Sequence, residues 1–133
     1  MSQKAQSFRD LKVYQVAFEL QQEIFELTKR FPREELYSLT DQIRRASRSV
    51  GGNIAEAWHK RRYIASFVSK LTDADGEQAE TQHWLDTSLA CGYVSPDRHA
   101  TLLRKCMDIG RMLGAMLANP EAWCVHFTKL PSR

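Results

Sequence analysis

The sequence contains no run of 18 apolar residues, so we expect no helix that spans a membrane. Residues 1–10 lack the apolar core of a secretory signal, which predicts a chain that is not exported. No glycine-rich phosphate loop is present, and we interpret Gly51 and Gly52 as glycines that permit close helix packing. The 133 residues, 43% apolar and 26% charged, suit one globular domain over 1–133 and do not favour disorder.

Cysteine is also scarce, with only Cys91, Cys106 and Cys124 in the chain. An odd count at wide spacing excludes a disulfide framework, and no Cys-x-x-Cys pair offers a zinc or redox site. We interpret all three as packing residues, because free cysteine behaves as a small apolar side chain. This usage predicts a reducing, cytoplasmic location.

What the sequence does contain is helical periodicity, interrupted by few prolines and glycines. We predict helices over about 9–31, 38–60, 63–91 and 96–118, with N-caps at Ser38 and Ser95. Long helices joined by short turns favour antiparallel neighbours. The predicted fold is therefore an all-α, antiparallel up-down-up-down four-helix bundle over about 9–118, followed by a tail at 119–133.

The first helical segment carries more apolar surface than one bundle can bury. Two apolar stripes lie on different sides of this segment. The first stripe consists of Leu11, Tyr14, Phe18 and Phe25. The second stripe consists of Val13, Val16, Ala17, Leu20, Ile24, Leu27 and Phe31. One interpretation is an imperfect, partly exposed stripe. The other is a subunit interface that includes Phe18, Phe25 and Trp84, since large exposed apolar patches usually mark partners.

Polar residues also interrupt the apolar stripe of residues 63–91, and a buried carboxylate there needs a partner. If neighbouring helices run antiparallel from a turn near residue 61, Asp75 lies near Arg48 and Glu77 lies level with Arg45. Arg45 and Arg48 are then either structural counter-ions, which we favour, or ligand-binding residues.

The net charge is only +3, but it is unevenly distributed. Residues 28–70 carry ten Lys or Arg and four acids, whereas residues 71–90 carry five acids and no Lys or Arg. In the predicted topology, the turn near residue 61 shares an end with the start of the first helix and with the tail. We therefore predict an electropositive end formed by Lys4, Arg9, Lys12, Lys60, Arg61, Arg62, Lys129 and Arg133.

Cations next to aromatic rings such as Trp58 and Tyr63 suit nucleic acid, because cations neutralise phosphates and rings stack on bases. The predicted contacts are Lys60, Arg61, Arg62 and Lys12, with Arg44 and Arg48 as the alternative contact surface. A solvated turn stabilised by the helix dipole is the other interpretation.

Two Glu-x-x-His spacings, Glu56 to His59 and Glu80 to His83, match those of di-iron carboxylate bundles. At ~1.5 Å per residue, however, the two pairs differ in height by roughly 20 Å. We therefore predict no metal site shared within one chain. No other catalytic set emerges, so we expect no cofactor, no catalytic residue and no enzyme.

Part of the sequence resembles a known family. The residues that carry the resemblance are Phe31-Pro32, Glu35-Leu36-Tyr37, Leu39, Gln42-Ile43-Arg44-Arg45-Ala46, Ser49-Val50 and Asn53-Ile54-Ala55-Glu56, together with the opening Phe8 to Tyr14. They resemble the four-helix bundle proteins related to the 23S rRNA intervening-sequence protein, over about residues 7–118. Ala57 departs from this pattern, which usually has glycine there, and residues 121–133 extend beyond the bundle.

The resemblance implies a bundle that assembles into a ring, typically a homopentamer. For relatives associated with diversity-generating retroelements, it implies a basic surface that engages nucleic acid and a reverse transcriptase. Two classes of function remain open from the sequence. One is a non-enzymatic homo-oligomeric scaffold that binds RNA, DNA or a nucleic-acid enzyme through its basic end. The other is an oligomeric protein-interaction module with no nucleic-acid role.

Overall fold

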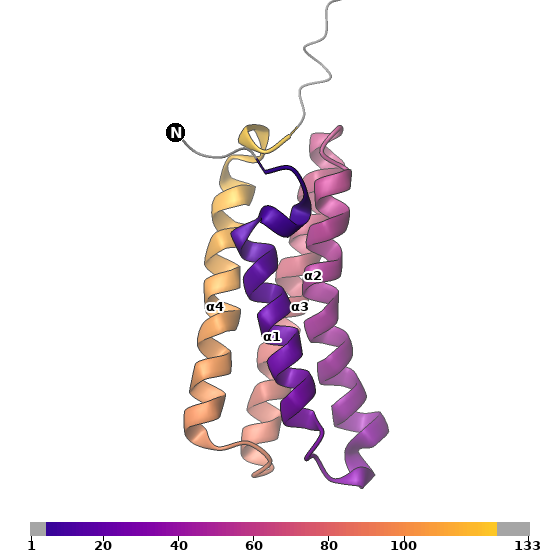
Figure 1. The fold of residues 1–133 in the computed structure, drawn as a ribbon, viewed down its shortest axis with the longest axis vertical. Helices are drawn as coiled ribbons and strands as arrows, with labels where there is room; N and C mark the ends of the chain where they lie inside the picture. The colour runs from indigo at the N-terminus through magenta and orange to yellow at the C-terminus, as the bar shows by residue number, and fades with distance from the viewer. Residues whose placement is uncertain (1–4, 125–133) are drawn as a thin grey trace, which may run out of the picture.

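The computed structural model describes residues 5–124, and no strand occurs in that range (Figure 1). Four α-helices make up this described part of the chain: α1 (Lys12–Thr28), α2 (Asp41–His59), α3 (Ile64–Ala90) and α4 (Pro96–Ala118). Short 3-10 turns lie at Phe8–Asp10, Arg33–Glu35 and Pro120–Ala122, and a π-helical turn covers Leu36–Thr40.

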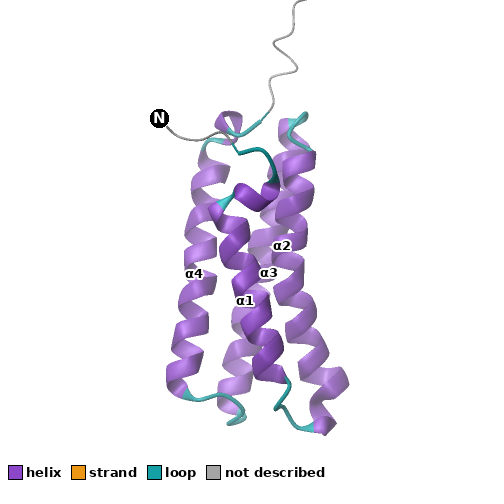
Figure 2. Ribbon diagram, viewed as in Figure 1, coloured by secondary structure: helices purple, strands orange, loops and turns teal. Residues whose placement is uncertain are grey.

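The helices form one antiparallel bundle in up-down-up-down order, as the sequence predicts (Figures 1 and 2). Helix α1 packs against α2 and α4, and α3 packs against the same two helices. The turn between α2 and α3 therefore lies at the same end of the bundle as the start of α1 and the end of α4 (Figure 1).

The core is a column of apolar side chains contributed by all four helices. Leu20 and Ile24 of α1, Leu71 of α3 and Leu113 of α4 are fully inaccessible to solvent. Burial of such a side chain contributes about 1.5–3 kcal/mol. The apolar side chains of α2 and of the turn before it are buried at Leu39, Ile43, Ala46, Val50, Ile54 and Ala57. Leu36 and Ile64 are exposed because they lie at helix starts.

Of the two apolar stripes on α1, the one that includes Val13, Ala17, Leu20 and Ile24 faces the core. The other stripe is only partly covered, and Phe18 is 46% exposed. The bundle thus buries one stripe, as the width of the apolar surface predicts.

The start of α1 differs from the sequence prediction of a helix over 9–31. Ser7 caps the 3-10 turn Phe8–Asp10, and Asp10 completes a capping box by accepting from the Ser7 backbone. Leu11 is extended, with φ −74° and ψ 129°, so α1 begins only at Lys12. It ends at Thr28, three residues earlier than predicted, and Phe31 is still buried.

The N-cap predicted at Ser38 is wrong. The chain is already helical from Arg33, and the π-helical turn runs directly into α2. The Ser38 hydroxyl instead donates to Glu35 Oε1 at 2.7 Å. A serine inside a helical turn has no unpaired backbone amide within reach, which is why it does not act as a cap.

The turn between α3 and α4 follows standard capping chemistry. Gly92 has φ +78°, and the amides of Gly92 and Tyr93 donate to Leu89 and Ser88 at the end of α3. This is the Schellman arrangement, which favours glycine at the left-handed position. The N-cap predicted at Ser95 is confirmed, because its side chain accepts from the Arg98 amide and Pro96 opens α4.

Candidate nucleic-acid interface

The turn that joins α2 to α3 is tight and carries three consecutive cations. Lys60 caps α2 by donating its amide to the Ala57 carbonyl, and Tyr63 closes the turn by donating to the Lys60 carbonyl. The side chains of Lys60 and Arg62 are exposed, and Arg61 is half-buried.

Other cations lie at the same end of the bundle (Figure 1). Lys12 opens α1 with an exposed side chain, and Arg9 stands 4.4 Å above the Phe8 ring. The Phe8 ring lies 6.2 Å from that of His59, which links the start of the chain to the end of α2. We call Arg9, Lys12, Lys60, Arg61 and Arg62 the basic end. Lys4, Lys129 and Arg133, also expected here, fall outside the described residues.

Arg61 has a structural role within the basic end. Its guanidinium lies 3.4 Å from the centre of the Trp58 ring, and its Nε donates to the Trp58 carbonyl at 2.7 Å. Burial lowers the pKa of Arg61, but a guanidinium remains protonated in proteins. Arg61 therefore holds the turn against α2 in addition to carrying charge.

Trp58 is not available to stack on a base, contrary to the sequence expectation. It is 8% exposed and belongs to the core, with Arg61 over its ring. The prediction was wrong because Trp58 lies on the side of α2 that faces the core, together with the buried Ile54 and Ala57. Tyr63, by contrast, is 63% exposed and remains available to a ligand.

Two of the acidic groups at this end, Glu56 and Asp10, are engaged by other partners. Glu56 pairs with Lys70 of α3 at 2.9 Å, and this hydrogen bond holds the pKa of Glu56 below its ordinary value. The Asp10 carboxylate accepts from the backbone amides of Gln6 and Ser7. Within residues 5–124, neither Lys12 nor Lys60 forms an ion pair with a carboxylate. The basic end thus keeps unneutralised positive charge.

Arg44 and Arg48, the alternative contacts, do not join the basic end. Arg44 lies sixteen residues before Lys60 in α2, which is about 24 Å along the helix axis. Its Nε donates to Thr28 Oγ1 at 2.7 Å, and its guanidinium stands 4.8 Å from the centre of the Phe25 ring. Arg48 stands 5.6 Å from the same ring. These two arginines belong to a separate surface formed by α1 and α2.

The proposed pairing of Arg45 and Arg48 with Asp75 and Glu77 is wrong. In the described part of the chain, none of Arg44, Arg45 and Arg48 has a carboxylate within ion-pair distance. Asp75 instead accepts from Gln78 Nε2 at 2.9 Å, in a polar ladder that continues to Gln82 along α3. Side chains within α3 satisfy the carboxylate, so it needs no cation from α2.

The residues expected at a subunit interface are partly exposed, but they lie on different helices. Phe18 stacks on Tyr14 with ring centres 6.1 Å apart. Phe25 is half-buried beneath cations, and Lys29 stands 4.9 Å from its ring centre. On α3, half-buried Trp84 donates its Nε1 to Glu80 Oε2 at 3.1 Å.

The Glu-x-x-His pairs are engaged in other contacts. Glu56 pairs with Lys70, and Glu80 accepts from Trp84. His59 lies near the Phe8 ring, and the His83 ring lies 4.7 Å from that of Trp84. Among residues 5–124, no three His, Cys, Asp or Glu side chains gather where they could hold a metal ion.

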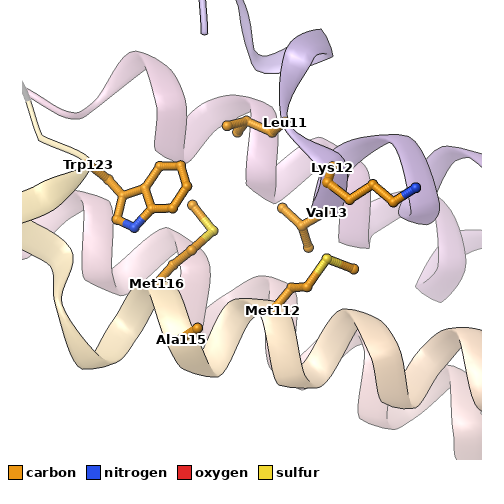
Figure 3. A pocket seen from close by; sticks show the side chains of 7 residues that line it. All are labelled: Leu11, Lys12, Val13, Met112, Ala115, Met116 and Trp123. Atoms are coloured by element: carbon orange, nitrogen blue, oxygen red, sulfur yellow. The ribbon is translucent and has the colours of Figure 1, made fainter. Parts of the chain in front are cut away.

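A small apolar pocket of about 190 Å³ lies between the start of α1 and the end of α4 (Figure 3). Its lining residues are Leu11, Lys12, Val13, Met112, Ala115, Met116 and Trp123. Lys12 is the only charged residue among them, so the pocket lacks a paired acid and base. Its volume is smaller than the roughly 300–1,000 Å³ of ordinary small-molecule sites.

Several contacts of this region were missed from the sequence. The pairing of Lys70 with Glu56 and the pocket wall formed by Trp123 depend on how separate helices meet. The contact of Lys29 with the Phe25 ring could have been predicted from the sequence, because residues four apart share one face of a helix.

The fold and its charge layout define a class: a small antiparallel helical bundle with a basic end. None of the helices in residues 5–124 combines the length and apolarity that a membrane crossing requires. The family model of the 23S rRNA-intervening sequence proteins matches residues 9–115, and the chain belongs to this family.

A solved structure supports this assignment. It is the crystal structure of a protein with unknown function from the S23 ribosomal protein family of Bacteroides thetaiotaomicron, which is 26% identical in sequence. The match has a TM-score of 0.73 and covers 80% of this chain and 96% of the other. A search of curated proteins finds no match.

Proposed function

We propose that the protein is a non-enzymatic, homo-oligomeric helical scaffold whose basic end binds RNA or DNA. The observation that carries the proposal is the unneutralised charge of Lys12 and Lys60 at one end of the bundle, where Glu56 and Asp10 are occupied by other partners. Such cations bind phosphates and release condensed counterions. The exposed ring of Tyr63 adds a surface on which a base can stack.

Self-assembly strengthens this proposal. The few cations of one basic end make a weak site, but a closed ring repeats that site and multiplies its affinity. Five copies is the number that the family resemblance implies. The partly exposed Phe18 and half-buried Phe25 and Trp84 supply aromatic surface for contacts between copies.

The absence of catalysis is part of the same proposal. Side chains that often serve as acids or bases are used here in local contacts, such as Glu56 with Lys70 and His99 with Asp86 at 2.8 Å. Three free thiols suit a reducing compartment, so we place the scaffold in the cytoplasm.

The test is a titration of a short single-stranded RNA with the wild type and with a Lys12→Glu, Lys60→Glu double variant. Both lysines are exposed, and Arg61 is kept because it supports the turn. We expect the wild type to bind with strong salt dependence and weak sequence preference, since phosphate contacts carry no base information. For each lysine that touches a phosphate, the variant should lose about 0.7 from the slope of log K against log salt.

A matched control reverses two exposed arginines of α4, Arg98→Glu and Arg104→Glu, which gives the same change in net charge. The control should bind RNA more tightly than the double variant does. Equal affinity in the two variants would show that net charge alone drives binding and would contradict a site at the basic end. A wild type that binds neither RNA nor DNA at low salt would leave an interaction module without a nucleic-acid role.

A further inference from the structure

Two half-buried aromatic side chains, Phe25 and Trp84, have charged neighbours. The neighbours of Phe25 are positively charged, and those of Trp84 are negatively charged. Phe25 of α1 is surrounded by Lys29, Arg44 and Arg48, and we call these four residues the basic patch. Trp84 of α3 follows Glu77 and Glu80 on one face of the helix, and we call these three residues the acidic patch. Neither patch belongs to the basic end.

The basic patch is ordered by its own contacts. Arg44 is fixed by its hydrogen bond to Thr28, and three cations stand within 5.6 Å of the Phe25 ring centre. Lys29 has Glu26 as a partner at 3.2 Å. The arginines have no carboxylate partner among residues 5–124, so their charge is not neutralised within the chain.

The acidic patch carries an excess of negative charge. Glu77 is half-buried, and its pKa is raised by burial and by the nearby carboxylates of Glu80 and Asp73. Glu80 is exposed, and its carboxylate holds the Trp84 indole by accepting a hydrogen bond from Trp84 Nε1. In the described part of the chain, no Lys, Arg or His pairs with Glu77 or Glu80.

We propose that the acidic patch of one copy docks on the basic patch of a second copy of this chain. Arg48 then meets Glu80 or Glu77, and Trp84 packs beside Phe25 beneath the Arg44 guanidinium. Tryptophan and arginine are the side chains that most often dominate binding energy at interfaces. A guanidinium over an indole adds a cation–π attraction.

The mode of contact follows from where the patches lie. The basic patch is shared by α1 and α2, whereas the acidic patch belongs to α3, so the two surfaces on one chain are different. A contact between different surfaces is heterologous, and it leads to a closed ring or an open filament instead of a symmetric pair. The inference rests on the homo-oligomer in the proposed function and names the surfaces that build it.

The test compares three variants by sedimentation: Arg48→Glu, Glu80→Lys and the charge swap that combines both. Both positions are exposed, and circular dichroism checks that each variant keeps its helical fold. We expect the wild type to sediment as an assembly and each single variant to fall towards the 15.4 kDa of one chain. The swap should restore the assembly, because it reverses both partners of the pair.

An Arg104→Glu variant on α4 is the matched control and should stay assembled. Raising salt from about 0.1 M to about 1 M should weaken the wild-type assembly, since the screening length falls from about 10 Å to about 3 Å. Single variants that sediment like an assembled wild type, or a swap that stays dissociated, would overturn this interface but leave self-assembly intact.

Two other outcomes separate this inference from the proposed function. A wild type that is monomeric at micromolar concentration would overturn both the interface and the homo-oligomer. An Arg48→Glu variant that stays assembled but loses RNA binding would assign the basic patch to nucleic acid and overturn the interface. Loss and rescue of assembly in a protein that binds no nucleic acid would support the interface and remove only the nucleic-acid role.

Discussion

At the scale of single residues, Arg61 combines two tasks that the sequence does not separate. Its charge belongs to the basic end, while its planar guanidinium lies on Trp58 and its Nε holds the end of α2. Lysine carries the same charge but presents neither a planar group nor a fixed Nε donor. Substitutions at this position therefore report on stability as well as on binding.

We expect Arg61→Lys to lower the free energy of unfolding by about 1 kcal/mol, the scale of one hydrogen bond and a partly exposed cation–π contact. Urea denaturation followed by tryptophan fluorescence measures the change. Lys60→Arg, which keeps charge at the neighbouring exposed position, is the control and should leave stability within about 0.5 kcal/mol. An unchanged midpoint in Arg61→Lys would show that the stacking does not stabilise the turn.

A second residue-scale prediction concerns Glu35, whose carboxylate accepts from Ser38 at 2.7 Å and from the Tyr93 hydroxyl at 2.8 Å. These bonds lower the pKa of Glu35 from 4.5, so their stabilisation is present above pH 4.5 and is lost as pH falls through the lowered value. The same contact raises the pKa of Tyr93 from 10.0 to about 12, and its stabilisation is lost as pH rises through that range.

The Tyr93→Phe variant tests this contact. The difference in stability between wild type and variant should be largest between pH 4.5 and 10.0 and should shrink outside both limits. In the wild type, one phenol should ionise near pH 12, as measured by ultraviolet absorbance. A stability difference that does not change with pH would assign the tyrosine a packing role only.

The role of a single residue can be predicted from the sequence when its contacts lie within one helix. The prediction fails when the contacts depend on how two helices pack together. Ser95 lies next to Pro96, and its capping role follows from that local pattern alone. The partners of Asp75 and the burial of Trp58 depend on rotations of neighbouring helices that periodicity fixes only roughly. A small error in the expected rotation of α3 replaces the actual partner of Asp75 within α3 by an expected partner on α2.

At the scale of elements, the turn between α3 and α4 requires a left-handed backbone conformation at Gly92. Its φ of +78° is strained for any residue with a Cβ, whereas Gly114 is helical and has open space where a Cβ would lie. The same substitution should therefore have opposite effects at the two positions.

We expect Gly92→Ala to destabilise the protein by about 1 kcal/mol and Gly114→Ala to stabilise it by about 0.5–1 kcal/mol. Thermal and urea unfolding of the two variants measure the difference, and each serves as the control for the other. A stabilised Gly92→Ala would mean that the turn relaxes to another conformation without loss of the Schellman hydrogen bonds.

The element boundaries show where periodicity is informative. The third and fourth helices begin and end within one residue of the predicted positions, because strong turn and cap signals enclose long apolar stripes. Residues 7–11 and 33–40 form 3-10 and π turns whose hydrogen bonds are local and whose sequences also suit α-helix. Apolar spacing carries too little information to separate these turns from the helices that follow.

At the scale of the whole molecule, the topology predicts the charge layout better than the charge count does. A net charge of +3 is uninformative, whereas an antiparallel order of four helices brings Lys12 and Lys60 to one end. The gathering of Arg44 and Arg48 around Phe25 could not be predicted, because it depends on Arg44 reaching Thr28 of another helix.

If the molecule is a homo-oligomer as proposed, its thermal midpoint should rise with protein concentration, because assembly stabilises only the folded state. Scanning calorimetry from low to high micromolar concentration measures the rise. The dissociated Arg48→Glu variant should unfold with a midpoint independent of concentration. A concentration-independent midpoint in the wild type would indicate a stable monomer or an assembly that persists through unfolding.

The α3–α4 turn also offers a way to orient the molecule on a surface. Cys91 at this turn is exposed, whereas Cys106 and Cys124 are buried, and burial raises the pKa of the Cys106 thiol to about 12. Both ends of the described chain, residues 5 and 124, lie at the opposite end of the bundle (Figure 1). A maleimide biosensor would therefore hold each chain by Cys91 with its basic end facing the flowing solution.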